Sequence, residues 1–334
     1  MILVTGATGL VGGNLMWQLL QKNDRVVAIR RATSKLESLY SIFSFYTSNP
    51  DAYLARIDWR IADVLDLELL NAVMQEITVV YHCAAVVSFA DNADILLDTN
   101  VIGTRNVVEA ALKHGVTKLC FVSSIAACGH EKDNKQIDEN SIWEDSESRS
   151  LYSRSKFYSE LEVWLGIEKG LKAVIVNPGI ILGVSGTNNG SSQLFSQVRK
   201  GLPFYTNGGS GYVDVRDVVA AMIQLTNSVV SGERFILVSE NCSNKDVLSW
   251  MSDGFGKRRP FIGIGKRTLV LVGCVSEILG KLFRFNPLID RSTARTATNR
   301  QYYSNTKIKT ALDFQFTSVE SCILEVCQYL NQRK

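Results

Sequence analysis

Short apolar runs alternate with longer amphipathic segments through the first half of the chain. The runs at residues 1–5, 25–29, 79–84, 118–123 and 172–177 are rich in β-branched residues and lack polar alternation, and residues 58–63 are a weaker candidate of the same kind. Strands covered on both faces of a parallel sheet have this composition. Helical patterns lie between them, near residues 10–22, 66–76, 91–114 and 151–168. The alternation predicts right-handed βαβ units and an α/β fold with a doubly wound parallel sheet.

The alternation ends after Pro178. Residues 183–193 are polar and glycine-rich, and residues 206–212 predict a second glycine turn. A helical pattern then resumes at residues 213–225, and a strand pattern follows at residues 234–239. The last hundred residues are mostly helical in pattern and have no regular βα alternation.

A chain of 334 residues is longer than one compact set of layers usually needs. We therefore predict a sheet domain from residues 1–178 and 212–240. Residues 179–211 and 241–334 would form a smaller, mostly helical lobe that binds substrate, made by chain that leaves the sheet and returns.

Composition and charge exclude several kinds of partner. The hydrophobic fraction is 46% and the charged fraction 21%, both ordinary for a soluble protein. The formal net charge of +3 is too small to argue for nucleic acid or an anionic membrane surface. The N-terminus has no basic leader or cleavage site, so we read no signal peptide and expect a cytoplasmic protein. The apolar stretch at residues 268–283 is too short for stable membrane insertion and predicts a packed or substrate-facing helix, with a membrane-surface helix as the alternative.

The cysteines and histidines give no sign of a disulfide framework or a metal site. The seven cysteines are odd in number and form no CxxC pair, which favours buried thiols in a reducing compartment. The three histidines have no spacing that resembles a zinc site or a Cys/His nucleophile pair. We therefore expect no metal.

The first predicted strand runs directly into GATGLVG, which places Gly6, Gly9 and Gly12 before an apolar helix. Glycines let the backbone turn sharply and approach a pyrophosphate, and the helix N-terminus offers unpaired N–H groups and the positive end of its dipole. A glycine triplet alone is weak evidence, but strand, triplet and helix together are the context that the motif requires. We predict dinucleotide binding in a Rossmann-type domain rather than a merely structural glycine turn.

The end of the second strand bears on the choice of dinucleotide. An NAD site of this fold usually has an acidic side chain there to accept from the ribose 2′-hydroxyl. This chain has Arg30 and Arg31 instead, and its next acidic residue is Glu37. Because a guanidinium suits a 2′-phosphate, we favour NADP over NAD, which stays possible. The alternative is that the two arginines are only a solvated strand end.

Polar residues of the right kinds for carbonyl chemistry follow the fifth strand. Ser123 and Ser124 stand at its carboxyl end, where open α/β sheets bind ligands. Tyr152 and Lys156 open the next predicted helix, and their four-residue spacing puts them on one face. The sequence NPG at 177–179 then crosses the same edge. Tyr303 and Lys307 repeat the spacing without a strand-end serine or an NPG turn, so we predict a structural role for that pair.

These residue types suit general acid–base catalysis beside a hydride donor. A carbonyl that receives hydride must also receive a proton. A phenol with its ordinary pKa of about 10 holds that proton at neutral pH, and a nearby cation makes the phenolate easier to form. Tyr152 would donate the proton, Lys156 would stabilise the phenolate, and Ser124 would orient the substrate oxygen. Sequence does not decide which of Ser123 and Ser124 contacts substrate.

Several motifs together resemble a known family. TGATGLVG, HCAA (82–85), NVIGTRNVVEAA (100–111), FVSSIAACG, YSRSK and NPGIILG resemble the extended short-chain dehydrogenase/reductases, also called the NAD-dependent epimerase/dehydratase superfamily. The resemblance runs through residues 1–225. The C-terminal sequence YYSNTKIKTALDFQFTSVESCILEVCQYL is similar to the branch of dihydroflavonol 4-reductases and 3β-hydroxysteroid dehydrogenase-like proteins.

The resemblance implies roles for further residues. Asp63 and Val64 would flank the adenine, and Asn100 would support the active site. Ala84 and Ala85 would line the cofactor, which is compatible with tight helix–sheet packing at the same positions. The expected catalytic residues are Ser124, Tyr152, Lys156 and Asn100. The expected cofactor contacts are Gly6, Thr8, Gly9, Leu10, Val11, Gly12, Arg30, Arg31, Asp63, Val64, Ala84, Ala85, Val86, Tyr152, Lys156, Pro178, Gly179 and Ile180.

One departure from the family pattern bears on substrate. Nucleotide-sugar members often read VYG after the serines and often carry an acidic residue beside the catalytic serine, whereas this chain reads AACG at 126–129 and has Ile125 and Ala126 there. The expected substrate wall is also mostly apolar: Val86, Val87, Phe89, Ala126 and Ala127. This favours a carbonyl on an apolar small molecule over a nucleotide sugar.

The sequence therefore predicts an NADP(H)-dependent carbonyl reductase or alcohol dehydrogenase. The alternatives are a nucleotide-sugar epimerase or dehydratase with tightly held NAD, and a dinucleotide-binding regulator without turnover, which the Ser124, Tyr152 and Lys156 set disfavours. The expected partner is a small-molecule substrate. The resemblance also suggests a homodimer built on the helices near 91–114 and 151–168.

Overall fold

The computed structural model describes residues 1–87, 93–129, 136–146, 149–186, 190–265, 267–268 and 298–332. Phe89, His130, Cys274 and all but Thr268 of the apolar stretch at 268–283 lie outside these residues.

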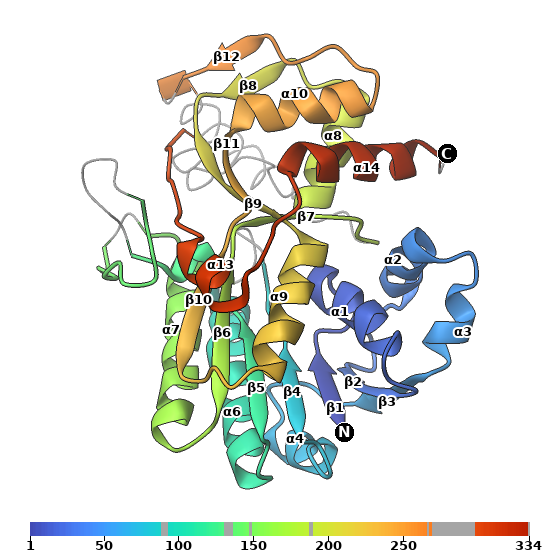
Figure 1. Cartoon of the computed structure of the whole chain (residues 1–334), viewed down its shortest axis with the longest axis vertical. Coiled ribbons are helices and arrows are strands. Elements are labelled where there is room, and N and C mark those ends of the chain that lie inside the picture. Colours follow the sequence, from blue (N-terminus) through green and yellow to red (C-terminus); the bar gives the residue numbers. More distant parts are fainter. Residues whose placement is uncertain are drawn as a thin grey trace.

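Within the described residues, a seven-stranded parallel sheet forms the centre of the lower part of Figure 1. Its order is β10-β6-β5-β4-β1-β2-β3, and every pairing is parallel. The strands are β1 (Ile2–Thr5), β2 (Val26–Arg30), β3 (Ile57–Ile61), β4 (Val79–His82), β5 (Lys118–Val122), β6 (Ala173–Pro178) and β10 (Glu233–Leu237). The predicted doubly wound sheet is confirmed, and the weak candidate at residues 58–63 is β3.

Helices cover both faces of this sheet (Figure 1). On one face α1 (Leu10–Leu20), α2 (Glu37–Tyr46) and α9 (Val215–Asn227) enclose a core that includes Leu15, Phe43 and Met222. On the other face α4 (Leu67–Val73), α6 (Gly103–Lys113) and α7 (Leu151–Glu168) enclose a second core. α3 (Pro50–Leu54) packs against α2. Burial on both faces explains why the strands read as continuous apolar runs.

The helix expected at residues 91–114 contains an interruption. α5 (Ala93–Leu97) leads into a π-helical turn at Asp98–Ile102, and α6 follows directly. Asn100 lies in this turn, and its carbonyl accepts from the Thr104 hydroxyl at 2.6 Å and the Ser159 hydroxyl at 2.7 Å. Single π turns inside helices often occur at functional sites. Sequence periodicity did not reveal this turn, because the apolar spacing continues through it.

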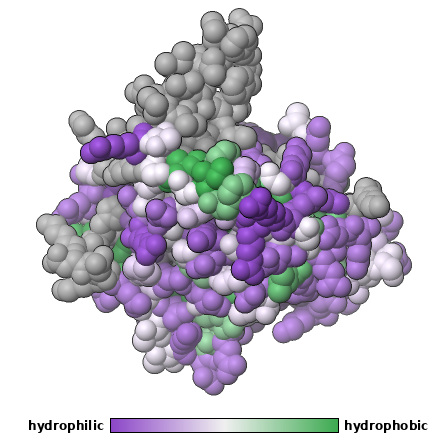
Figure 2. Space-filling view, turned by 90° about the horizontal axis from the view of Figure 1, so that it is seen from above, coloured by the Kyte–Doolittle hydropathy of each residue, from purple (hydrophilic) through white to green (hydrophobic). Residues whose placement is uncertain are grey.

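The upper part of Figure 1 has smaller sheets and separate helices. β7 (Ile180–Leu182), β9 (Gly209–Asp214) and β11 (Glu240–Ser243) form one sheet, and β8 (Phe204–Thr206) pairs with β12 (Ile262–Ile264). α8 (Ser191–Lys200), α10 (Asn244–Gly254) and α14 (Val319–Gln332) pack around a third core, and α13 (Thr306–Leu312) packs against β10. Figure 2 views this end from above and shows a mostly hydrophilic surface with one larger hydrophobic patch and several smaller ones.

The glycine turn expected at residues 206–212 is shorter than predicted: the chain turns at Asn207 and Gly208, between β8 and β9, and from Gly209 to Asp214 it is a strand. Gly211 is needed there for space: a Cβ would lie 2.6 Å from Cγ2 of Val238. The helix expected from residue 213 begins two residues later, after Asp214, whose side chain accepts from the Arg216 N–H. Close packing, rather than turning, explains this glycine.

The described thiols agree with the expectation of reduced cysteines. Cys120, Cys128, Cys242, Cys322 and Cys327 are buried and free, and Cys83 is half-buried and free. Among the helices of the described residues, none combines the length and the apolar character that crossing a membrane requires.

The glycine turn after β1 gives a direct test of the packing. A Cβ at Gly12 would lie 2.2 Å from the carbonyl oxygen of Gly6, whereas at Gly9 it would lie 3.3 Å from the same oxygen. We expect Gly12→Ala to lower the free energy of unfolding by about 1–3 kcal/mol, the usual cost of overpacking. Gly9→Ala is the matched control and should cost clearly less. Thermal and denaturant unfolding without added nucleotide would measure both, and equal losses would contradict this account.

Candidate active site

The carboxyl ends of β1, β4, β5 and β6 lie in a row along one edge of the sheet. These strands are neighbours in the order β6-β5-β4-β1 and run parallel. The chain moves outward from β1 through β2 to β3 and then returns to β4 on the other side of β1. The edge between β1 and β4 is therefore the topological switch point, where open α/β sheets bind ligands.

The glycine turn lies at this switch point. Gly6 has φ +66°, a left-handed conformation that favours glycine, and a Cβ there would lie 2.6 Å from the Ala84 nitrogen. Gly9 is the N-cap residue of α1 and makes no side-chain cap. The first N–H groups of α1 therefore have no partner within the helix, as at any helix N-terminus. A tight turn followed by an uncapped helix fits the pyrophosphate of a dinucleotide. Thr8, Leu10 and Val11 belong to the same turn.

Arg30 and Arg31 stand at the end of β2, the strand next to β1. The Arg30 guanidinium carbon lies 5.9 Å from the centre of the Trp59 ring. Among the described residues, the buried Nε of Arg30 finds no hydrogen-bond partner. Arg31 is exposed, and its main-chain N–H donates to the Ser34 hydroxyl at 3.1 Å. A held guanidinium with an unused buried donor fits an anionic group at this strand end.

The other expected cofactor contacts follow the same edge. Asp63 and Val64 are the second and third residues after the end of β3. The Val64 carbonyl accepts from the Asn106 side chain at 3.0 Å. Ala84, Ala85 and Val86 follow β4 and are half-buried. Pro178 ends β6, and Gly179 donates its N–H to the Leu237 carbonyl at 3.0 Å. Ile180 is exposed beside them.

Tyr152 and Ser124 meet where β5 ends and α7 begins. The Ser150 hydroxyl caps α7 by accepting from the Ser153 N–H at 3.1 Å, and the Ser153 hydroxyl donates to the Ala126 carbonyl at 2.5 Å. These contacts fix the first turn of α7 against the loop after β5. The Tyr152 and Ser124 side chains form a hydrogen bond. Burial raises the pKa of Tyr152, and the hydrogen bond from Ser124 opposes that change.

Lys156 is buried one turn further along α7. Its side chain is 3% exposed, and its ammonium donates to the Val122 carbonyl at 3.0 Å. Burial lowers the pKa of Lys156 to about 8, while the charge of Glu160 opposes this shift. Lys156 therefore stays mostly cationic at neutral pH, on the same helix face as Tyr152.

A buried hydrogen-bonded chain connects β1 to the π-helical turn. The Thr5 hydroxyl accepts from the Ala84 N–H at 3.1 Å and faces His82 Nδ1 at 2.7 Å. His82 Nε2 lies 3.0 Å from the Thr104 hydroxyl, whose own proton goes to the Asn100 carbonyl. Thr104 must therefore accept from Nε2–H, and because His82 is neutral its Nδ1 accepts from the Thr5 hydroxyl. Burial, with Lys156 nearby, lowers the pKa of His82 to about 3.

Asn100 connects this chain to the active-site loop. Its amide accepts from the Val86 N–H at 2.8 Å and donates to the Val86 carbonyl at 3.1 Å and the Ser155 hydroxyl at 3.0 Å. Asn100 therefore holds the main chain after β4 and touches α7 one residue before Lys156. The contacts are those of a supporting residue.

Sequence reasoning missed a buried carboxylate behind the serines. The Ser123 hydroxyl donates to Glu160 Oε1 at 2.5 Å, so Ser123 faces the interior while Ser124 faces Tyr152. Asn177 donates to the same carboxylate and to the Ser124 carbonyl at 3.0 Å. Glu160 follows Lys156 by the spacing that separates Lys156 from Tyr152, and that repeated spacing was the available signal.

The second tyrosine–lysine pair has different surroundings. Tyr303 precedes α13 and is buried, and its hydroxyl donates to Gln301 at 2.9 Å. Lys307 lies in α13 and forms an ion pair with Glu233 at 2.8 Å. The two residues are not on one continuous helix, so the four-residue spacing does not bring them to one face.

The expected apolar wall is described only in part. Val87 is 58% exposed, and Val86 and Ala126 are half-buried. Ala127 is completely buried and cannot reach a ligand in this conformation. Phe89 lies outside the described residues.

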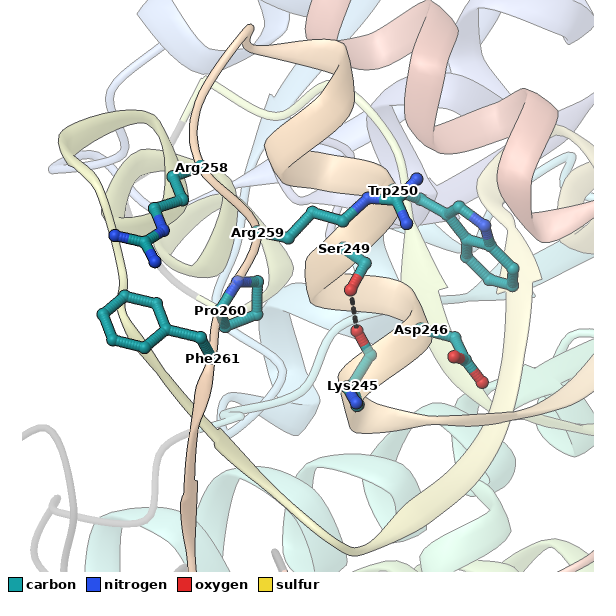
Figure 3. A pocket seen from close by; sticks show the side chains of 8 residues that line it. All are labelled: Lys245, Asp246, Ser249, Trp250, Arg258, Arg259, Pro260 and Phe261. Carbon is teal, nitrogen blue, oxygen red and sulfur yellow. Dashed lines mark hydrogen bonds between the residues drawn. The ribbon is translucent and has the colours of Figure 1, made fainter.

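A cavity of about 520 Å³ lies elsewhere, between α10 and the chain leading to β12 (Figure 3). Arg259 beside it forms an ion pair with Asp253 at 2.7 Å, and the Arg258 guanidinium lies 4.1 Å from the Phe261 ring centre. Because none of the residues at the strand ends lines it, we assign this cavity no part in the chemistry. Its lining residues are Lys245, Asp246, Ser249, Trp250, Arg258, Arg259, Pro260 and Phe261.

Several known proteins are similar to this chain over most of its length. Residues 2–237 match the model of the NAD dependent epimerase/dehydratase family. The chain is 28% identical to a provisionally named dihydroflavonol 4-reductase of Synechocystis sp., over 98% of this chain and 93% of the relative. It is also 28% identical to a UDP-glucose 4-epimerase of Vibrio cholerae, over 87% and 85%. The crystal structure of gox2253 superposes with a TM-score of 0.82 at 27% identity, over 99% of this chain and 98% of that one.

The family model covers most of the chain and includes every residue of the strand-end site. The chain therefore belongs to the NAD-dependent epimerase/dehydratase family of extended short-chain dehydrogenase/reductases, and it is an NAD(P)-dependent oxidoreductase.

Proposed function

We propose that the protein is an NADP(H)-dependent oxidoreductase that reduces a carbonyl, or oxidises an alcohol, on a largely apolar small molecule. The observation that carries the proposal is the hydrogen-bonded Tyr152–Ser124 pair with the buried Lys156 one turn away. Apolar residues beside the serines favour this substrate class over a nucleotide sugar.

The glycine turn, the uncapped α1 and Arg30 would hold the dinucleotide. When bound, the cofactor supplies or accepts a hydride. Ser124 would hold the substrate oxygen by hydrogen bonding, and the Tyr152 hydroxyl would give that oxygen its proton. The Lys156 ammonium would stabilise the phenolate left behind, and the residues around it keep water away. In the oxidation direction the same phenolate would take the proton back.

The choice of NADP rests on Arg30. Its guanidinium is held beside Trp59 with an unused buried Nε, and no carboxylate follows β2 until Glu37. A 2′-phosphate would complete this arrangement with charge-assisted hydrogen bonds. A screen of NADPH oxidation with apolar aldehydes and ketones, beside a panel of nucleotide sugars, tests the function. Tightly retained NAD with sugar interconversion would support an epimerase instead.

Tyr152→Phe keeps the ring but removes the proton that the phenol gives. Turnover of any accepted carbonyl should fall by roughly two to four orders of magnitude, the usual scale for a positioned proton donor. Cofactor affinity should barely change in this variant. Lys156→Met should reduce both turnover and cofactor affinity. Steady-state rates and cofactor titrations measure these effects.

Tyr303→Phe is the matched control for Tyr152→Phe, because it removes a buried phenol hydroxyl that donates to Gln301 rather than bonding to a strand-end serine. It should keep nearly normal turnover. Near-normal turnover of Tyr152→Phe, or an equal loss in Tyr303→Phe, would refute the assignment of the proton donor.

Arg30→Ala should weaken NADPH binding far more than NADH binding. A lost charge-assisted contact is worth roughly 1.5–3 kcal/mol, or about ten- to a hundredfold in affinity. Arg25→Ala is the control, since Arg25 precedes the opposite end of β2 and pairs with Asp58. Calorimetric titration with both nucleotides distinguishes the outcomes, and equal losses for NADPH and NADH in Arg30→Ala would contradict the role.

We further propose a homodimer through the outer faces of α6 and α7, which pack side by side. Tyr158, Leu161 and Leu165 lie three and four residues apart on α7 and are 39%, 40% and 54% exposed. Such an apolar stripe on an outer helix suits a second copy of the chain. The double variant Leu161→Glu/Leu165→Glu should be monomeric by light scattering. Val229→Glu, at an exposed residue outside the helices, should leave the mass unchanged, and a native chain that is already monomeric would refute the dimer.

A further inference from the structure

Glu160 is buried where a carboxylate is costly. Its side chain is 1% exposed, on the face of α7 that carries Tyr152 and Lys156. Burial raises the pKa of Glu160, and the hydrogen bonds from Ser123 and Asn177 and the charge of Arg234 act in the opposite direction. Donors on both oxygens, the Ser123 hydroxyl and Asn177 amide on Oε1 and the Arg234 guanidinium on Oε2, favour the carboxylate against that burial, at some cost in stability.

The hydrogen bonds of Glu160 lead directly to the serine of the proposed site. Glu160 Oε1 accepts from the Ser123 hydroxyl at 2.5 Å and from the Asn177 amide. The same Asn177 amide donates to the Ser124 carbonyl at 3.0 Å. One carboxylate therefore fixes both the side chain of Ser123 and the main chain of Ser124. The Ser124 hydroxyl also accepts from the Ala126 N–H at 3.1 Å, so the direction of its side chain is set from both sides.

A second set of contacts holds Glu160 from β10. Arg234 Nη1 lies 3.4 Å from Glu160 Oε2, and Arg234 also donates to the Glu139 carbonyl at 2.9 and 2.6 Å. The Glu139 carboxylate accepts from the Ile236 N–H at 2.8 Å. Glu160 is thus held by residues of β5, β6 and β10, and its position does not depend on α7 alone.

Glu160 also lies one turn after Lys156 among the buried residues of α7, where its negative charge raises the pKa of Lys156. The groups that face this region are Lys156 on α7, Arg234 on β10, Glu139 in the loop before α7, Cys128 after β5, and His82 and Cys83 at β4. His82 is neutral, and burial raises the pKa of Cys83 and Cys128, so both thiols are uncharged. Among the described groups that act on Lys156, Glu160 is the charged one of opposite sign.

We propose that Glu160 is a positioning residue of the active site, which holds Ser124 through Asn177 and serves as the buried counter-ion of Lys156. The proposal rests on the proposed function, since it assigns Ser124 and Lys156 the roles given there. Glu160 touches neither substrate nor cofactor in this account. It acts through the two residues that do.

The test separates the effect of the Glu160 charge from the effect of its hydrogen bonds. Glu160→Gln keeps an oxygen acceptor but removes the charge, so Lys156 should lose its proton at lower pH. The basic limb of the kcat/KM profile should move to lower pH, and kcat should fall by roughly tenfold or more, on the scale of a lost pairing at a proton-transfer site. Glu160→Asp keeps the charge on a shorter side chain. Its basic limb should stay near the native position while kcat falls, because the carboxylate no longer reaches Ser123 and Asn177 together.

Glu162→Gln is the matched control on the same helix, because Glu162 pairs with Arg105 on the outer side. It should leave both the pH profile and kcat unchanged. The protonation of Lys156 can also be followed without substrate, by NMR titration of lysine ¹³Cε signals assigned with Lys156→Met. A lower titration pH of Lys156 in Glu160→Gln supports the counter-ion role, whether or not the enzyme turns over any carbonyl. A carbonyl panel without turnover would overturn the proposed function alone. An unchanged Lys156 titration in Glu160→Gln, or the same shift in Glu162→Gln, would overturn the proposal.

Discussion

The parallel pairing of β1, β4, β5 and β6 is the constraint on which the site depends. Because the strands run in one direction, the glycine turn, Ala84, Ser124 and Pro178 all come to one edge of the sheet. The switch in direction between β1 and β4 opens that edge to a ligand. α7 then begins beside the same edge, held to the loop after β5 by the Ser153 hydroxyl, which donates to the Ala126 carbonyl.

Burial strengthens the hydrogen bonds of the polar residues at this edge and also makes an unpaired polar group there costly. Lys156, Glu160, His82 and Asn100 are all at most 3% exposed. Each is satisfied by a specific partner: a main-chain carbonyl for Lys156, donors for Glu160, two hydroxyls for His82 and the Val86 main chain for Asn100. A removed partner would leave a buried polar group unpaired, which costs more than the bond itself contributes. The network therefore fixes one arrangement of the site.

Much of the sheet domain could be predicted from sequence, because strands buried on both faces leave continuous apolar runs between helical patterns. The glycine turn was predicted from its place after the first strand, and Tyr152 and Lys156 from their spacing at the start of a helix that follows a strand-end serine. The π-helical turn at Asn100 was not, because it leaves the apolar spacing unbroken. The first residues of β9 were mistaken for part of a turn, because Gly211 is required by close packing against Val238 rather than by backbone conformation. Glu160 was overlooked because charged residues on helices are usually exposed, and its partners come from three separate strands.

The central claim is net hydride transfer from NADPH to a carbonyl, with the proton coming from Tyr152. The most direct measurement is the amount of reduced nicotinamide consumed when the protein and NADPH are mixed with apolar aldehydes and ketones, followed together with the alcohol formed. We expect one NADPH lost for each alcohol produced. Interconversion of a nucleotide sugar on retained NAD, with no net change in nicotinamide and no reduction of any carbonyl in the panel, would contradict the account.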